Sequence, residues 1–267
     1  MNKIEKLGKN IKKRDIAAIG KNVTIGENVE IGNWSKIGNN VSIGNDVFIG
    51  NNVTIGDSVS IAEKCQIEGN VTIGYVNLTK KKDYYNDFNT SIGKNCLIRN
   101  GAIIYHACKL GENNWINNYA ILRENTTIGN NTTIGAHVMC EGYTEIGNFV
   151  AIHSLCGLGG NMIIEDKVFI GTNVVTANNP RSLHQRGFPT TKRWEKSGMK
   201  CIDKGPTIRF GARIGISAML LADIEIGRES MVAAGAIVTK DVPPFTIVRG
   251  IPAKIVGTVP EHERLKN

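Results

Sequence analysis

An aliphatic residue recurs at every sixth position over most of this 267-residue chain. The step is unbroken through residues 19–73, resumes in a new phase through 92–176, and resumes a third time through 208–238. Neither an α-helix, whose side chains repeat about every 3.6 residues, nor a β-strand, whose side chains alternate, has this period. A parallel β-helix does have it, because each hexapeptide supplies one short strand and one corner, and three hexapeptides close a triangular coil. The period therefore predicts an all-β solenoid.

In such a solenoid, residues 18 apart in sequence lie one above another, at the spacing of about 4.8 Å between paired strands. From roughly thirty repeats we expect about ten coils. Two stretches break the step, residues 75–91 and 177–206, and we interpret them as loop insertions. The predicted organisation is a basic N-terminal cap at 1–18, a solenoid at 19–257 and a short tail at 258–267.

The composition fits a thin aliphatic core and a basic surface. Aromatic residues make up 6% of the chain, there are 30 glycines, and the formal net charge is +8. Of the acidic partners that such a charge favours, we expect a phosphate-bearing small molecule rather than nucleic acid or a membrane. The opening residues carry charges without an apolar stretch, and no apolar run approaches the roughly 18 residues of a spanning helix. We therefore expect a cytoplasmic protein.

The corner residue that follows each aliphatic residue is glycine along most of the first run, and the departures cluster in the second run. When the corners are sorted into columns 18 apart, one column is glycine from residue 93 to residue 147. The second column carries Arg99, Asn117 and His153, and the third carries Tyr105, Arg123 and Glu141. Function in a solenoid lies where the repeat is broken, so these columns predict a binding surface along two of the three edges.

Two histidines are candidates for a general base. His153 occupies a corner where the repeat calls for glycine, so it either acts on the reacting groups or packs at a subunit interface. His106 lies 18 residues before Glu124, and a carboxylate beside an imidazole is the usual way to build a general base. The alternative for that pair is an ordinary exposed cross-strand contact. Arg123 and Glu141 are likewise expected to be neighbours, either holding a sugar or a phosphate or forming a surface ion pair.

Most of the cysteines follow the repeat. Five of the six fall at inward positions, where we expect buried, reduced thiols: Cys65, Cys96, Cys108, Cys140 and Cys156. Cys201 falls in the second insertion, and its role stays open. The cysteine spacing does not suit a metal, and no metal is expected.

The repeat strongly resembles the left-handed β-helix of the hexapeptide-repeat acyltransferases, and the left hand of the coil follows from that resemblance alone. The stretch MVAAGAIVTKDVPPFTIVRGIPAKIVG, residues 231–257, resembles the terminal signature of the acetyl-CoA-dependent members. The resemblance implies acetyl-CoA as co-substrate, with basic side chains on its phosphates. The donor-site residues that we expect are Ser217, Ala222, Ala234, Gly235, Lys240 and Arg249.

The stretch VVTANNPRS, residues 174–182, resembles members that acetylate nucleotide-linked amino sugars, in which the following loop contributes to the sugar site. The acceptor-site residues that we expect are Asn117, Asn118, Arg123, Glu141, Asn178 and Arg181. Asn118 stands where the family often has histidine. The proton of the acceptor then has to be handled by His153, by His106 with Glu124, or by the substrate's own amine.

These likenesses imply an acetyl-CoA-dependent N-acetyltransferase acting on a dTDP- or UDP-linked 3-amino deoxysugar in surface glycan biosynthesis. The family is typically trimeric, which implies a homotrimer with its sites at the subunit interfaces. Two alternatives stay open: O-acyl transfer to a sugar or UDP-sugar, to which FVAIHSLCG has some likeness, and a non-catalytic scaffold. A zinc-dependent carbonic anhydrase on the same coil would need a close pair of histidines, which the sequence lacks.

Overall fold

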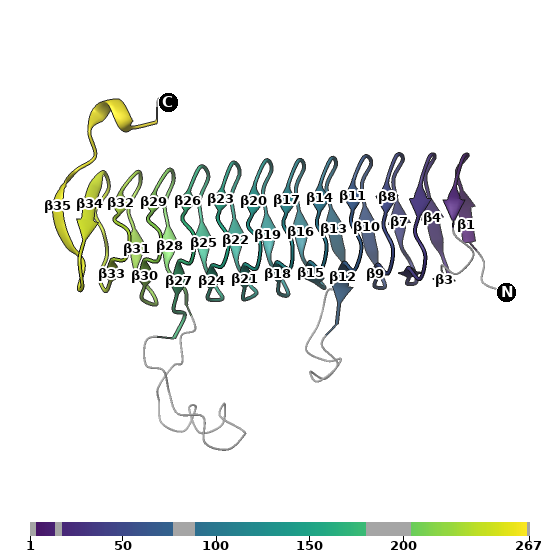
Figure 1. Ribbon diagram of the computed structural model, residues 1–267, viewed down its shortest axis with the longest axis horizontal. Helices are drawn as coiled ribbons and strands as arrows, with labels where there is room; N and C mark the ends of the chain where they lie inside the picture. The colour runs from purple at the N-terminus through teal and green to yellow at the C-terminus, as the bar shows by residue number, and fades with distance from the viewer. Residues whose placement is uncertain (1–3, 14–17, 77–88, 180–203, 266–267) are drawn as a thin grey trace, which may run out of the picture.

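The computed structural model describes residues 4–13, 18–76, 89–179 and 204–265, and these form one parallel β-solenoid (Figure 1). Its strands are mostly two or three residues long and fall into three sheets, which are the three faces of a triangular prism. Sheets A and C have 11 strands each and sheet B has 13, so there are about eleven coils rather than about ten. The all-β solenoid predicted from the six-residue period is confirmed.

Each coil contributes one strand to each sheet, in the order A, B, C. In spatial order, sheet A contains β1 (Ile4–Leu7), β4 (Val23–Ile25), β7 (Ser42–Ile43), β10 (Val59–Ile61), β13 (Thr90–Ile92), β16 (Lys109–Leu110), β19 (Thr127–Ile128), β22 (Glu145–Ile146), β25 (Ile163–Ile164), β28 (Thr207–Ile208) and β31 (Glu225–Ile226). Sheet B contains β2 (Lys12–Lys13), β5 (Glu30–Ile31), β8 (Phe48–Ile49), β11 (Gln66–Ile67), β14 (Leu97–Ile98), β17 (Trp115–Ile116), β20 (Thr133–Ile134), β23 (Ala151–Ile152), β26 (Phe169–Ile170), β29 (Arg213–Ile214), β32 (Met231–Val232), β34 (Thr246–Arg249) and β35 (Lys254–Thr258). Sheet C contains β3 (Ala18–Ile19), β6 (Lys36–Ile37), β9 (Thr54–Ile55), β12 (Thr72–Tyr75), β15 (Ile103–Tyr105), β18 (Ile121–Leu122), β21 (Met139–Cys140), β24 (Gly157–Leu158), β27 (Val175–Thr176), β30 (Met219–Leu220) and β33 (Ile237–Val238).

The hexapeptide explains both the core and the corners. Val23 and Ile25 are buried while Thr24 between them faces outward, and the next hexapeptide repeats the pattern. The last corner residue before each buried position has a left-handed backbone, with φ of 56° at both Asn22 and Asn28. Asparagine tolerates this conformation better than most side chains, which explains its recurrence there.

The five described cysteines are buried free thiols, as their inward positions predict. Burial raises the pKa of Cys108 to about 12 and that of Cys140 to about 11. Neither thiol therefore supplies a thiolate at neutral pH. Cys201 lies outside the described residues.

Both ends of the solenoid differ from the expected boundaries. β1 pairs with β4 and β2 pairs with β5, so a first coil lies within residues 1–18, which the sequence assigns to a cap. At the other end, β35 runs antiparallel to β34, and a short 3-10 helix, η2 (Glu261–Glu263), follows. Arg213 Nη1 donates to Glu263 Oε2 at 3.1 Å and ties this tail to the prism. No helix among the described residues is long and apolar enough to cross a membrane.

Candidate functional site

Two of the three prism edges carry the residues that the sequence singles out. We call the corners that follow the strands of sheet B the BC edge, and the corners that follow the strands of sheet C the CA edge. The second column, with Arg99, Asn117 and His153, lies on the BC edge, because these residues follow β14, β17 and β23. The third column lies on the CA edge. The two edges flank the outer face of sheet C.

His153 is exposed on the BC edge, and the fold around it is undisturbed. Its backbone N–H donates to Ile170 O at 2.8 Å, which is the regular contact to the next coil. Its ring meets Phe169 edge-on, with 4.9 Å between the ring centroids. The inward neighbours Ile152 and Cys156 are both 1% exposed. His153 is therefore a substitution at an outward position that leaves the core of the repeat intact.

Beyond His153, the BC edge is lined by small residues over the next three coils toward the C-terminus. The first corner positions are Gly171, Gly215 and Ala233. The left-handed positions are Asn173, Ser217 and Gly235. Ile216, 57% exposed, is the one large apolar side chain among these corners. The result is a track of mostly small residues that runs along the prism from Gly235 to the corner of His153, where Leu155, 55% exposed, is a second large apolar side chain.

The expected donor residues divide between the two edges. Ser217, Ala234 and Gly235 lie on the BC edge and are exposed. Arg249 ends β34, and its neighbour Gly250 accepts a hydrogen bond from Ile237 N at 3.1 Å, so the hairpin lies beside the last coil. Two other expected residues follow strands of sheet C instead: buried Ala222 after β30 and exposed Lys240 after β33. Within one chain, these two are on the CA edge and do not join the BC track.

Both insertions leave the prism at the CA edge. The first follows β12 and the second follows β27, and Figure 1 shows both breaks along the same lower side of the prism. Residues 77–88 and 180–203, which include Arg181, lie outside the described residues. Between the two departures, the corners that follow β15, β18 and β21 carry His106, Arg123, Glu124 and Glu141.

His106 and Glu124 lie one coil apart, as predicted, but they are not an exposed pair. They are 1% and 2% exposed respectively. His106 Nδ1 lies 3.3 Å from Tyr75 O. Arg123 donates two hydrogen bonds to the Glu124 carboxylate, from Nε to Oε2 at 3.2 Å and from Nη2 to Oε1 at 2.9 Å. Partial burial alone would lower the pKa of Arg123, but hydrogen bonding to Glu124 raises it and the net direction is upward.

The expected pairing of Arg123 with Glu141 is replaced by two other contacts. Arg123 turns to its chain neighbour Glu124, which is nearly buried and offers a bidentate partner. Glu141 is exposed and accepts a hydrogen bond at 3.4 Å from Nδ2 of Asn178. Two expected acceptor residues, Glu141 and Asn178, are therefore brought together at the start of the second insertion.

Sequence reasoning left three tyrosines of the CA edge without a role. Tyr75 and Tyr105 pack edge-on with 4.8 Å between their centroids, and the guanidinium of Arg123 lies 6.0 Å from the centroid of Tyr105. Tyr143 is 50% exposed and has a left-handed backbone, with φ of 58°. The signal for Tyr105 was its place at a corner that otherwise holds glycine.

The remaining expected residues on the BC edge have mixed environments. Asn117 Nδ2 donates to Ile134 O at 2.9 Å, so this amide caps the backbone of the next coil. Asn118 is half-buried, and its carbonyl accepts from His137 N at 2.9 Å. Nε of Arg99 is buried without a hydrogen-bond partner among the described residues. The structure does not join His153 to the His106–Glu124 pair, because the two lie on different edges of one chain.

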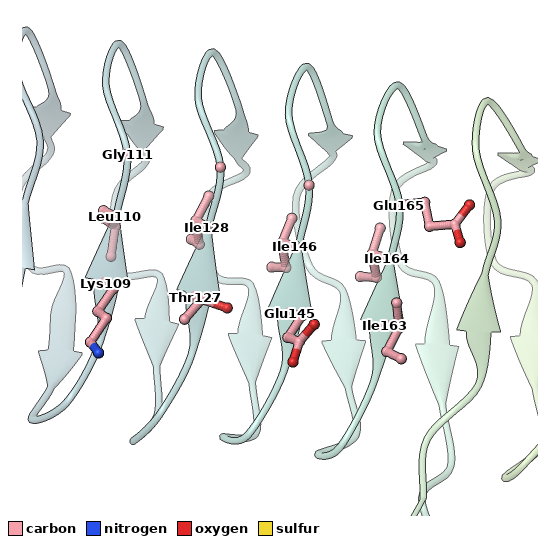
Figure 2. Close-up of a pocket in the computed structure, with 12 residues that line it drawn as sticks. Lys109, Leu110, Gly111, Thr127, Ile128, Glu145, Ile146, Ile163, Ile164 and Glu165 are labelled. Carbon is pink, nitrogen blue, oxygen red and sulfur yellow. The ribbon is translucent and has the colours of Figure 1, made fainter. Parts of the chain in front are cut away.

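A depression of about 580 Å³ on the outer face of sheet A contains none of the expected site residues (Figure 2). Lys109, Thr127, Glu145 and Ile163 point out from successive strands there. Glu165 at the rim of the depression forms a salt bridge with Arg209, with 2.8 Å between Oε1 and Nη1. This face is a regular sheet surface with both polar and apolar outward side chains. Among the described residues, no group of three or more His, Cys, Asp or Glu side chains could hold a metal ion.

Comparison with known proteins finds partial matches to the repeat. The family model described as "Bacterial transferase hexapeptide (six repeats)" matches residues 40–75 and 107–142. Serine acetyltransferase 4 of Arabidopsis thaliana is 34% identical over 116 residues, which are 43% of this chain and 31% of that protein. Serine acetyltransferase of Escherichia coli K12 is 34% identical over 110 residues, 40% of this chain and 38% of that protein. The chain thus spans less than half the length of these relatives.

A UDP-N-acetylglucosamine acyltransferase from Campylobacter jejuni has a TM-score of 0.52 to this chain at 18% identity, covering 92% of this chain and 75% of that one. At this identity the likeness shows the fold alone. The chain therefore shares hexapeptide repeats at residues 40–75 and 107–142 with this family model, and its fold is similar to the left-handed β-helix that the sequence resemblance implied.

Proposed function

We propose that the protein transfers an acetyl group from acetyl-CoA to a small acceptor, and that the donor lies along the BC edge. The observation that carries this proposal is the track of small residues from Gly235 to His153. The track crosses three coil spacings, about 14 Å, which leaves room for a thin extended arm along the prism. A donor thioester that enters from the coil of Gly235 then points toward the exposed His153.

His153 would act as the general base of the transfer. The acceptor's hydroxyl or amine attacks the thioester carbonyl while its proton passes to the imidazole. The carbon–sulfur bond then breaks, and the CoA sulfur leaves and takes the proton back from the imidazolium. Holding donor and acceptor together on one edge would supply a large share of the rate.

The outer face of sheet C supports a homotrimer. Its outward residues are apolar over successive coils, with Met139, Val175 and Met219 between 36% and 40% exposed. Three parallel prisms that turn this face toward a common axis bring the BC edge of each copy against the CA edge of the next. In that arrangement His153 of one copy would face the neighbour's CA corners at Glu141 and Gly159, which follow β21 and β24 at the level of its own coil. Lys240 of the neighbour could then serve the donor phosphates.

For the acceptor, we propose a nucleotide-linked amino sugar, whose amine receives the acetyl group. Glu141 and Asn178 support it, because they form a polar pair beside the second insertion, where the related loop contributes to a sugar site. O-acyl transfer is the second candidate. It is favoured by the curated relatives, which are named serine acetyltransferases.

Donor binding is the first test of this proposal. Acetyl-CoA should raise the melting temperature of the wild-type protein and bind in calorimetry. Ala234→Trp should abolish both effects by filling the track. Glu112→Trp, at an exposed corner after sheet A, should behave as wild type. Absence of acetyl-CoA binding to the wild-type protein would favour a non-catalytic scaffold.

The acceptor is then tested by thiol release from acetyl-CoA in the presence of dTDP- and UDP-linked amino sugars, UDP-N-acetylglucosamine and L-serine. Release with the amino sugars alone is the expected result. Release only with UDP-N-acetylglucosamine, which has no free amine, or with L-serine to give an O-acetylated product, would reject N-acetyl transfer and establish O-acyl transfer.

A further inference from the structure

The N-terminal coils carry a depression on the BC edge, toward the other end of the prism from the donor track. Its volume is about 640 Å³, and it spans the corners of four successive coils. The residues that line it are Trp34, Phe48, Gly50, Asn51, Asn52, Glu68, Gly69, Asn70 and Asn100.

Two large aromatic side chains stand exposed at this depression. Trp34 is 62% exposed and Phe48 is 45% exposed, in a chain with only 6% aromatic residues. Trp34 has a left-handed backbone with φ of 57°, at a position that holds Asn52 and Asn70 in the next two coils. A tryptophan there costs about 1 kcal/mol more than a residue that favours this conformation, and it gains no burial in return. Tyr119, Tyr143 and Phe149 are also exposed at left-handed corner positions. Trp34 differs from them in lining a depression together with a second exposed aromatic side chain, Phe48.

The polar side chains of the lining are amides and one carboxylate. Asn52 Nδ2 donates to Asn70 Oδ1 at 2.7 Å, and Asn51 Oδ1 accepts from Asn33 N at 2.8 Å. Glu68 Oε2 accepts from Asn100 N at 2.9 Å. These bonds leave Nδ2 of Asn51, Nδ2 of Asn70 and Oε1 of Glu68 as groups that can bond a ligand. Glu68 itself stands at a corner where most coils of this run have glycine.

The nine lining residues include no lysine and no arginine, although the chain has a net charge of +8. This chemistry disfavours phosphates and nucleic acid, which require cations. It fits a molecule with many hydroxyl or N-acetyl groups and an apolar ring face: the amides and the carboxylate bond the polar groups, and the aromatic rings pack on the C–H face. We propose that this depression, Trp34 to Asn100, is a binding site for a neutral saccharide chain.

A second depression of about 420 Å³ adjoins the first and shares Phe48, Gly50 and Asn51 with it. It continues over the outer face of sheet B toward the first coil, where Lys12 and Glu30 pair at 2.8 Å. The two depressions therefore form one continuous surface, with Phe48 in the lining of both. The site is independent of acyl transfer, because no residue of the BC track or the CA edge contributes to it.

The test is titration of the full chain with chitotetraose, cellotetraose and maltotetraose, followed by saturation-transfer NMR and calorimetry. At least one of these chains should bind, and Trp34→Ala and Phe48→Ala should each weaken binding about tenfold or more. Trp115→Ala is the matched control, because Trp115 is 52% exposed on the same sheet but outside both depressions, and it should bind as wild type.

Failure of all three saccharides to bind overturns the proposal, as does unchanged binding by Trp34→Ala. A change in sedimentation mass for Trp34→Ala would also overturn it and would make this surface a contact between copies of the chain. Circular dichroism of each variant shows that the fold is kept. Acetyl-CoA binding is measured in parallel, and because it uses a different edge, its loss or retention does not decide the saccharide result.

Discussion

His153 shows how a single residue can carry chemistry on a repetitive scaffold. The neighbouring inward positions, Ile152 and Cys156, keep the core, and only the corner side chain departs from the repeat. The ring is held by one edge-on contact with Phe169 and is otherwise exposed. A side chain at such an outward corner can contact an acceptor while the core residues beneath it keep their packing.

We expect His153→Ala to keep acetyl-CoA binding and the oligomer while turnover falls about 10²- to 10⁴-fold, the loss typical of a missing general base. Turnover is measured by thiol release, and binding by calorimetry. His137→Ala is the control, because His137 is exposed on the same edge and only stacks on Tyr119, with 5.1 Å between the centroids. If His153→Ala turns over like the wild type, His106 or the substrate's own amine becomes the better account.

At the level of the single hexapeptide, the tight element is the corner on the CA edge. A Cβ added at Gly142 would collide with the carbonyl oxygen of Glu124 in the coil before it. That carbonyl also accepts the backbone N–H of Tyr143 at 2.9 Å, so it cannot move aside freely. The corner that positions the Arg123–Glu124 pair therefore depends on glycine for close backbone approach.

Gly142→Ala should lower the free energy of unfolding by about 1–3 kcal/mol, the usual cost of overpacking. Gly257→Ala is the matched control, because a Cβ at Gly257 meets no atom within 4 Å. Urea unfolding followed by circular dichroism gives both values. Equal midpoints for the two variants would show that the CA corner relaxes without cost.

The elements themselves could be predicted well, and the side-chain pairs less well. The aliphatic step fixes strand, corner and stacking, because burial of every sixth residue allows few other folds. The aliphatic period did not predict the first coil. Lys13 pairs in register with Ile31, so a lysine occupies a position at which the period requires an aliphatic residue. Stacking made Arg123 a neighbour of Glu141, but periodicity does not say which way a long side chain turns, and Arg123 turned to Glu124. The period also assigns His153 and His106 to different columns of corners, so the two histidines lie on different edges of a single chain.

Across the whole molecule, the outer faces of sheets A and C differ in chemistry. The outward residues of sheet A include Lys109, Thr127 and Glu145, whereas those of sheet C are apolar over the coils that carry the candidate site. An exposed apolar face of this length is best explained by contact with further copies of the chain. The proposed trimer would bury it and would complete the site from two edges.

Met139→Glu combined with Met219→Glu should dissociate the oligomer, because two carboxylates would be buried at the interface. Sedimentation velocity should then give the mass of one chain, 29.0 kDa, against three times that mass for the wild type. Ile163→Glu is the control, since Ile163 is a 43% exposed apolar residue on sheet A. A monomeric wild type, or dissociation by the control alone, would reject the sheet C interface.

The stacking of residues 18 apart also determines which changes in chain length the protein can absorb. Removal of 18 residues from the N-terminal coils shortens the prism by one coil and leaves every downstream residue on its own face. Removal of a single hexapeptide instead rotates the rest of the prism by one third of a turn relative to the coils before it. Each edge of the shortened prism then combines corners that belonged to two different edges, although the inward aliphatic residues still follow the six-residue repeat. Viable insertions and deletions in this chain should therefore come in units of whole coils, except at the two corners where the repeat is already interrupted.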